Sequence, residues 1–208
     1  SGMPLELVEP EWGSHLASVI VDLEKLRTKR LSGPARPYIF FQLKGIFQML
    51  ESLGSARIEG NRTTLAEVVD RYIEHDAKET NDEKIREIMN IEGALAFIEE
   101  HIDAGAALNR AFLSELHKRL VDGLAPPPVG EGSRYPGVLR PINVIIQRST
   151  HRPPNALKAP EHFDDLLEFV NRSVEPKNDL LVTAIAHHRM AWIHPYDNGN
   201  GRMVRLLT

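Results

Sequence analysis

The sequence predicts an all-α fold interrupted by one short β-hairpin. Apolar residues recur at helical spacing along most of the 208-residue chain. The helical period disappears between residues 123 and 160, where prolines and glycines surround one β-rich run. The composition, 42% hydrophobic and 26% charged, is typical of a globular protein with a full core.

The N-terminal part of the chain predicts two long helices. The first covers residues 11–29, and LSGPARP at 31–37 ends it because proline removes a backbone donor. The second begins near Tyr38 and ends at Gly60, since glycine commonly closes a helix. Its apolar residues follow the helical repeat, which predicts one buried stripe. The stripe consists of Leu43, Ile46, Phe47, Leu50 and Leu53.

Shorter helices complete the predicted fold. They are expected at residues 65–75, 82–103, 110–121, 160–172 and 179–193. Thr64 and Glu67 are spaced as a capping box before the first of these, and Asn109 caps the third. Pro195 ends the last, because the residue before a proline disfavours helical backbone. In the gap before the fourth helix, PINVIIQR at 141–148 predicts one arm of an exposed hairpin.

Composition and charge exclude several kinds of function. The chain has 25 basic and 29 acidic residues, a formal net charge of −4, so no overall positive field attracts nucleic acid or an anionic membrane. It has no cysteine, which excludes disulfides and thiolate nucleophiles and agrees with a reducing compartment. No apolar stretch reaches the length of a membrane span. We therefore expect a cytoplasmic protein in which any anion site is local.

The densest group of polar residues is IHPYDNGNGRMVR, at residues 193–205. A helix ending at His194, a Gly-Asn-Gly turn at 199–201 and a new helix would point several backbone N–H groups into one concavity. Arg202 and Arg205 follow at the start of the new helix, where cations oppose the helix dipole unless an anion is bound. The pattern predicts a polyphosphate site, with His194 at its rim as a general base.

Two plainer interpretations compete with this one. A Gly-Asn-Gly turn between helices can be only a turn, although the histidine and the two arginines together favour phosphate binding. His187 and His188 suggest a metal site with His194, yet no carboxylate lies at ligand spacing on that helix. Since His187 precedes His194 by one heptad, it could instead pack against it.

A second unusual feature is SARIEGN, at residues 55–61. Ser55 and Glu59 are i,i+4 neighbours on one helix face, and Glu59 lies in the last turn, where the helix dipole disfavours negative charge. An acid at this position favours an external cation as its partner. The alternative is a solvated glutamate beside Gly60.

The segment from His194 to Arg205 resembles the motif of Fic-domain proteins, His-Pro-Phe-x-Asp/Glu-Gly-Asn-Gly-Arg-x-x-Arg, with tyrosine in place of phenylalanine. AIAHHRMAWI before it, and NVII followed by HRPP, resemble the family's core helix and its substrate-binding flap. The similarity covers most of residues 80–208. SARIEG also resembles the inhibitory motif Ser/Thr-x-x-x-Glu-Gly/Asn of the Fic class that carries its inhibitory helix before the core.

This resemblance implies an autoinhibited protein adenylyltransferase, which moves AMP from ATP to a Tyr, Thr or Ser hydroxyl of a target protein and releases pyrophosphate. His194 would take the proton from the hydroxyl, and Arg202 would clamp the β- and γ-phosphates. Arg205 would contact the γ-phosphate in the active state and Glu59, with Ser55 beside it, in the inhibited state. Phosphate-binding backbone amides, joined by the Asn200 side chain, would come from Gly199, Asn200 and Gly201.

The resemblance also divides the chain into an N-terminal helical extension, residues 1–79, and a Fic-type helical core, residues 80–208. The extension holds the inhibitory helix, at about 38–60. The core holds the flap, whose strand would receive the target segment by edge pairing. That strand consists of Asn143, Val144, Ile145 and Ile146. Because the family continues with further helices, we expect the core to be truncated at its C-terminus.

One departure from the family concerns Mg²⁺. Where the family has an acidic residue before Gly-Asn-Gly, this chain has Asn198, with Asp197 one place earlier. An amide oxygen is a neutral and weaker ligand for a hard cation. We therefore expect Asp197 to assist or replace Asn198 as the metal ligand.

Two classes of function remain open. The first is the autoinhibited adenylyltransferase, with ATP and Mg²⁺ as cofactors. The second is a catalytically weak regulatory module, in which Asn198 has lost metal-assisted transfer and ATP occupancy is only sensed. Such a module could belong to a larger DNA-binding regulator, for example through a downstream winged-helix domain. A homo-oligomer is compatible with either class.

Overall fold

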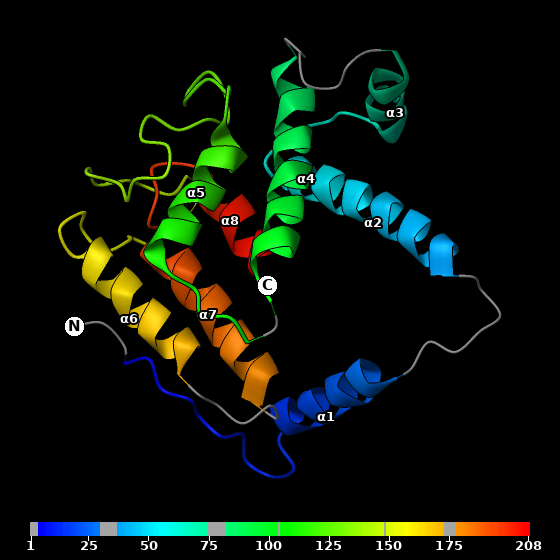
Figure 1. The fold of residues 1–208 in the computed structure, drawn as a ribbon. Coiled ribbons are helices and arrows are strands. Elements are labelled where there is room, and N and C mark those ends of the chain that lie inside the picture. The colour runs from blue at the N-terminus through cyan, green and yellow to red at the C-terminus, as the bar shows by residue number, and fades with distance from the viewer. Residues whose placement is uncertain (1–3, 30–36, 75–81, 104, 148, 173–177) are drawn as a thin grey trace.

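The computed structural model describes residues 4–29, 37–74, 82–103, 105–147, 149–172 and 178–208. Helices dominate the described chain, as the sequence predicts (Figure 1). They are α1 (His15–Thr28), α2 (Pro37–Ile58), α3 (Leu65–Glu74), α4 (Glu83–His101), α5 (Arg110–Val121), α6 (Ala159–Asn171), α7 (Asp179–Ile193) and α8 (Asn200–Leu206). None of these helices is long and apolar enough to cross a membrane. The predicted break at 31–37 falls almost entirely outside the described residues.

Side-chain caps begin the helices where the sequence predicts them. Asn109 Oδ1 accepts the N–H of Phe112 at 2.9 Å and starts α5. The capping box before α3 is formed, because Thr64 N–H donates to Glu67 Oε2 at 2.6 Å and Glu67 N–H donates to Thr64 Oγ1 at 3.3 Å. Such caps satisfy the backbone donors that a helix start leaves free. Helix α1 begins later than predicted, because the Ser14 hydroxyl caps it.

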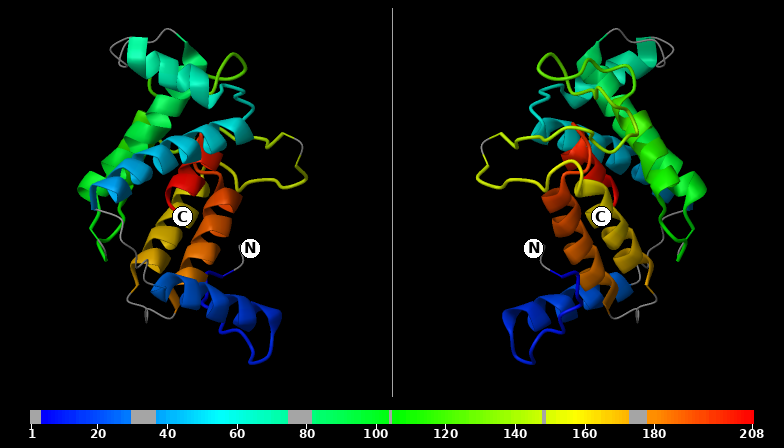
Figure 2. Two further views of the ribbon diagram at one scale, coloured as in Figure 1. Left: turned by 90° about the vertical axis from the view of Figure 1, so that its right-hand side faces the viewer. Right: turned by 90° about the vertical axis from the view of Figure 1, so that its left-hand side faces the viewer.

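Helix α8 lies at the centre of the fold. It contacts α2, α4, α5 and α7, while α4 also packs against α2 and α5, and α6 packs against α7. Both views of Figure 2 show α8 between α2 and the α6–α7 pair. The largest fully buried apolar side chains of the core include Phe163, Ile88, Ile91, Leu116, Ile193 and Met203. The residues that lead into α8 are therefore held by elements from both halves of the chain.

The predicted buried stripe of α2 is wrong for most of its length. Leu53 is 6% exposed, whereas Leu50 is 44% and Phe47 is 59% exposed. Leu43 and Ile46 are exposed as well. Figure 1 shows the reason, since the N-terminal turns of α2 extend past the other helices. Where α2 does pack, Ser52, Leu53 and Ala56 are buried while Leu50 is exposed, so the buried face is also rotated away from the predicted stripe.

The β-hairpin predicted around 141–148 is not shown, since no strand occurs among the residues described. Residues 141–147 form an irregular loop in which Ile145 is exposed. The returning segment contains Pro153 and Pro154, which have no N–H to donate to a strand ladder. Asn143 closes the loop instead, because its Oδ1 accepts the N–H of Ala156 at 2.8 Å.

Two leucines of α2 allow a matched test of its packing. Leu53→Ala should lower the free energy of unfolding by about 2–5 kcal/mol, because it leaves a cavity in the core. Leu50→Ala should lower it by less than about 1 kcal/mol, since exposed side chains contribute little to stability. Urea denaturation followed by circular dichroism measures both values. Equal losses for the two variants would mean that α2 is buried along its whole stripe.

Candidate active site

The turn between α7 and α8 is held by its own side chains. Helix α7 ends at Ile193, and His194 takes the left-handed conformation, with φ 50° and ψ 61°, before Pro195. Asn200 then bridges the backbone of Tyr196: its Oδ1 accepts the Tyr196 N–H and its Nδ2 donates to the Tyr196 carbonyl, each at 2.9 Å. The turn is therefore closed before any ligand binds. The Asn200 side chain thus holds the turn, and its predicted contact with phosphate stays a prediction.

A buried histidine that the sequence did not single out supports this turn from below. His117 of α5 stacks on Tyr196, with ring centroids 3.8 Å apart. Its Nδ1 accepts the N–H of Gly137 at 2.8 Å, which leaves Nε2 to donate to the carbonyl oxygen of Asn198, 3.1 Å away. Burial lowers the pKa of His117 to about 4. The neutral ring can thus accept from one segment and donate to the other.

His194 lies at the rim of the turn as a neutral imidazole. Burial is the main cause that lowers its pKa to about 4, and the positive charge of Arg140 acts in the same direction. Arg140 is 1% exposed and donates to the carbonyl oxygens of His194 at 2.7 Å and Ile142 at 3.0 Å, and to that of Pro154. Arg140 therefore joins the predicted flap to the histidine. Sequence reasoning missed it, because an arginine in a loop is usually solvated.

The structure brings together the predicted inhibitory pair and the last arginine of the motif. Arg205 Nη2 donates to Glu59 Oε1 at 2.6 Å, and Arg205 Nε donates to Ser55 Oγ at 2.9 Å. Glu59 lies in the turn just after α2 ends at Ile58. A Cβ atom on Gly201 would lie 2.6 Å from Glu59 Oε1. The carboxylate therefore rests against the first turn of α8, where the helix dipole favours a negative group.

Arg202 faces the other way and is not presented to this site. Its side chain is fully buried, with Nη1 3.2 Å from Glu87 Oε1. Its Nη2 donates to the carbonyl oxygen of Glu131. Arg202 is thus enclosed by protein in this structure, and its predicted role as a clamp for the β- and γ-phosphates stays a prediction. The two motif arginines lie three residues apart on a short helix, so one faces the core and the other faces α2.

The two predicted metal ligands do not fit a Mg²⁺ site as they stand. Asp197 accepts hydrogen bonds from the Ser133 hydroxyl and, at 2.9 Å, from the Arg134 N–H, so its carboxylate is turned to the neighbouring loop. Asn198 Nδ2 donates to the Gly132 carbonyl oxygen at 3.0 Å and lies 3.3 Å from Glu131 Oε2. The described residues contain no group of three or more His, Cys, Asp or Glu side chains placed to hold a metal. Loop donors thus hold both oxygens of Asp197, while Asn198 is held through its Nδ2.

The alternative metal site at His187, His188 and His194 is not assembled in the described part of the chain. His187 and His188 are both exposed on α7. His187 Nδ1 lies 3.3 Å from Thr208 Oγ1. The suggested packing of His187 against His194 stays a prediction.

Comparison with known proteins finds one matching family. Residues 107–208 match the Fic/DOC family. Residues 107–208 of this chain therefore form a Fic-type domain. The match begins at residue 107, between α4 and α5, so it does not test the predicted division of the chain at residue 79, which stays a prediction.

Relatives of the Fic domain occur in animals and bacteria. Protein adenylyltransferase Fic of Drosophila willistoni is 28% identical over 165 residues, which cover 74% of this chain and 29% of that protein. Protein adenylyltransferase fic-1 of Caenorhabditis elegans is 26% identical over 72% of this chain and 28% of its own length. The chain thus spans less than a third of these relatives. The crystal structure of a Fic family protein from Desulfovibrio desulfuricans G20 matches with a TM-score of 0.71 and 25% identity, over 99% of this chain and 58% of that chain.

The low pKa of His117 makes the Fic domain sensitive to acid. Its pKa is about 4 in the folded protein against an ordinary 6.5, so between these values the unfolded chain binds a proton that the folded chain does not. Stability is therefore fully present above pH 6.5 and is lost as pH falls toward 4. From pH 7 to pH 5 this histidine alone should remove about 2 kcal/mol.

Urea denaturation at the two pH values tests this for wild type, His117→Gln and the control His187→Gln. The His117 variant should lose about that part of the pH dependence, while the exposed His187 variant should keep it. His194 contributes in the same direction and remains in all three proteins. An unchanged pH dependence in His117→Gln would contradict the assignment.

Proposed function

We propose that this chain is an autoinhibited protein adenylyltransferase that transfers AMP from ATP to a Tyr, Thr or Ser hydroxyl of a target protein. The single observation that carries the proposal is the contact of Glu59 with Arg205, at 2.6 Å, over the first turn of α8. There a carboxylate contacts the last arginine of the motif, at a position that would suit an anion. Relatives of this chain are named protein adenylyltransferases. We interpret the carboxylate as a stand-in for a phosphate group.

In the proposed reaction, His194 acts as the general base. Its imidazole is neutral, because its pKa is about 4, and it accepts the proton of the target hydroxyl. The hydroxyl oxygen forms a bond to the α-phosphorus, and the bond from that phosphorus to the bridging oxygen of the β-phosphate breaks. Pyrophosphate leaves with the electron pair of the broken bond, and AMP stays on the target.

The nucleotide phosphates would bind the backbone N–H groups of residues 199–201 at the start of α8. Arg205 would hold the γ-phosphate once Glu59 has withdrawn. The Glu59 carboxylate and a γ-phosphate compete for the same guanidinium and for the same space beside Gly201. With Glu59 in place, ATP can bind only with its α-phosphate away from His194, which is how we explain the inhibition.

The target segment would dock along residues 143–146 of the flap. This loop starts at Ile142, whose carbonyl oxygen is held by Arg140, the same arginine that binds the His194 carbonyl oxygen. A segment paired with the loop backbone would keep its hydroxyl at a fixed distance from His194 while leaving its sequence free to vary. The exposed Ile145 offers an apolar contact beside that backbone.

The remaining parts of the proposal follow from the resemblance to the family. ATP is the nucleotide, and Mg²⁺ its predicted companion, although no residue of this chain is assigned to the metal. Residues 1–79 act as the inhibitory extension and residues 80–208 as the catalytic core. A cysteine-free chain agrees with action in the cytoplasm.

A second candidate is a regulatory module that binds ATP without efficient transfer. The observation that favours it is the commitment of the Asp197 carboxylate to Ser133 and Arg134, next to an asparagine at the family's acidic position. In such a module nucleotide binding would persist and the AMP adduct would be missing. The Glu59→Gly variant separates the two candidates, because removing the inhibitory acid should expose any transfer activity.

Substitution of Glu59 tests the inhibition directly. Incubated with ATP and Mg²⁺, Glu59→Gly should incorporate AMP, into itself or an added target, at least tenfold faster than wild type, measured by intact mass. Glu59→Gly/Arg205→Ala should lose this gain, because the γ-phosphate then has no clamp. Ser55→Ala should have a smaller effect, since it removes one hydrogen bond, worth about 0.5–1.5 kcal/mol net. Equal rates for wild type and Glu59→Gly would show that Glu59 is not inhibitory.

Substitution of His194 separates chemistry from binding. In the Glu59→Gly background, His194→Ala should lower AMP transfer by about 10²–10⁴-fold, the usual contribution of a general base. The affinity for a non-hydrolysable ATP analogue, measured by calorimetry, should change little, because the proposed phosphate contacts do not involve the imidazole. The variant Glu59→Gly/His187→Ala is the control and should keep its activity. A His194→Ala protein that transfers AMP at a near-normal rate would remove the histidine from the mechanism.

A further inference from the structure

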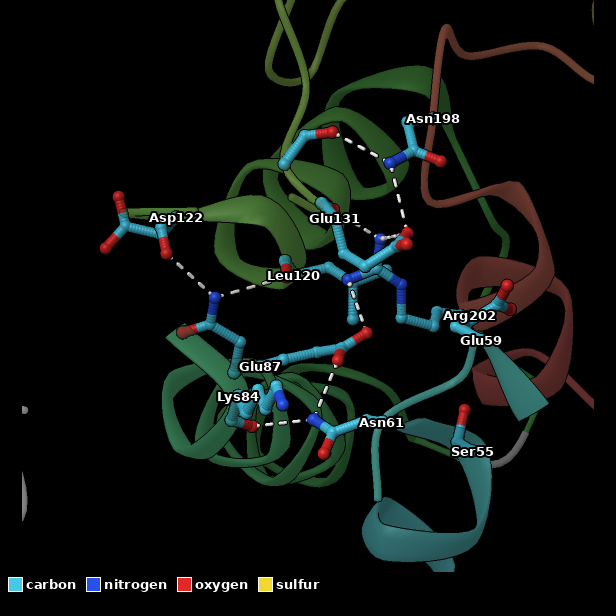
Figure 3. A network of polar contacts seen from close by, with 12 residues as sticks. Ser55, Glu59, Asn61, Lys84, Glu87, Leu120, Asp122, Glu131, Asn198 and Arg202 are labelled. Atoms are coloured by element: carbon cyan, nitrogen blue, oxygen red, sulfur yellow. Dashed lines mark hydrogen bonds and ion pairs between the residues drawn. The ribbon is translucent and has the colours of Figure 1, made fainter. Parts of the chain in front are cut away.

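A buried carboxylate on α4 lies between the inhibitory turn and the Fic motif. Glu87 is 3% exposed, and its two oxygens face different segments (Figure 3). Glu87 Oε2 accepts a hydrogen bond from Asn61 Nδ2 at 2.9 Å, and Glu87 Oε1 lies 3.2 Å from Arg202 Nη1. Burial raises the pKa of Glu87, while Arg202 and Asn61 stabilise its charged form. Glu87 has no part in the proposed AMP transfer or in the alternative role as a regulatory ATP-binding module.

The partners of Glu87 connect directly to the inhibitory pair. Asn61 follows Glu59 by two residues, and its Nδ2 also donates to the Lys84 carbonyl oxygen at 2.8 Å. Asn61 therefore fixes the turn after α2 onto α4. Arg202 precedes Arg205 by three residues on α8, so a shift of one would move the other.

The inhibitory turn and α8 are thus joined twice. The first link is the direct contact of Glu59 with Arg205, whose side chains are 28% and 27% exposed. The second runs from Asn61 through Glu87 to Arg202 and is buried throughout. Since the second link contains neither member of the first, it remains in place when Glu59 is removed.

We propose that Glu87 is a positioning residue that couples the inhibitory turn, residues 59–61, to α8 by holding Asn61 and Arg202 with one carboxylate. Glu87 keeps the turn and α8 in register, so that Glu59 meets Arg205 without having to order either segment itself. Inhibition then depends on Glu87 although it touches neither Glu59 nor Arg205. The proposal rests on the inhibitory role of Glu59 given above.

The two arms of this link can be removed one at a time. The Glu87–Arg202 contact is an attraction between charges, because Arg202 Nη1 and Glu87 Oε1 form no aligned hydrogen bond. Glu87→Gln removes that charge and keeps an oxygen that can accept from Asn61. Asn61→Ala removes the other arm and leaves the Glu87–Arg202 pair.

Helix α4 also supplies matched controls. Glu92 is a half-buried carboxylate that accepts a hydrogen bond from Tyr72 on α3, so Glu92→Gln changes the same group away from the motif. Asn90 Nδ2 donates to the carbonyl oxygens of Leu120 at 3.2 Å and Asp122 at 2.8 Å, so Asn90→Ala removes two asparagine bonds of the same kind.

The measured quantity is an inhibition ratio, the AMP-transfer rate with Gly at position 59 divided by the rate with Glu at position 59. Any loss of activity that is common to both backgrounds cancels in this ratio. Asn61→Ala and Glu87→Gln should each lower the ratio at least threefold, and the double variant should lower it no further, because both act on one link. Glu92→Gln and Asn90→Ala should leave it within twofold of the original, even where urea denaturation shows a loss of stability.

Several results would overturn the proposal. An unchanged ratio in both Asn61→Ala and Glu87→Gln would mean that Glu87 only stabilises the fold, and independent effects that multiply in the double variant would mean that there is no shared link. If Glu87→Gln does not fold, Asn61→Ala decides alone. If Glu59→Gly transfers no AMP, the proposed function fails. The ratio is then the dissociation constant of a non-hydrolysable ATP analogue with Glu at position 59 divided by that with Gly at position 59, which tests the link without catalysis.

Discussion

The fold around the motif depends on one buried cation, the guanidinium of Arg202. A charge that is fully enclosed by protein is strongly unfavourable unless opposite charge and hydrogen-bond acceptors surround it. Glu87 supplies the charge from α4, and the carbonyl oxygen of Glu131 supplies an acceptor from the loop before the flap. Helix α8 can therefore occupy the centre of the fold only if α4 and that loop are in place. The position of the motif is set by this requirement as much as by apolar packing.

Around this anchor, neutral groups shape the turn that precedes α8. The Asn200 amide closes it against Tyr196, and His117 supports it as an uncharged ring that accepts from one segment and donates to another. Desolvation keeps both His117 and His194 neutral, with pKa values of about 4. For His117 this preserves an acceptor, and for His194 it preserves a lone pair. Desolvation thus allows His117 to support the turn and His194 to act as the proposed general base.

Helix starts were predictable from sequence, because capping residues act locally. The pairing of Glu59 with Arg205 joins residues 146 positions apart, and it was expected only from the resemblance to Fic-domain proteins. What sequence could not predict was which groups become enclosed. Arg202 and Arg205 look equivalent in the motif, yet one lies against α4 and the other against α2, and this depends on segments more than a hundred residues away. The apolar residues of α2 were identified from the sequence, but which of them become buried depends on the elements that pack beside the helix. Asp197 was expected to face a cation, and hydrogen bonds from a distant loop decided otherwise.

The difference in burial between the two arginines also explains how one helix can hold a permanent contact and an exchangeable one. Breaking a fully buried pair such as Arg202 with Glu87 would leave an uncompensated charge in the core, so we expect this contact to persist whether or not the proposed nucleotide is bound. Arg205 and Glu59 are each more than a quarter exposed, so water can solvate either group while the other is replaced. A phosphate can then take the carboxylate's place on the guanidinium with little change in the charge around it. The inhibition proposed here acts through a partly exposed pair anchored by a buried one, so its release would not require the motif to unfold.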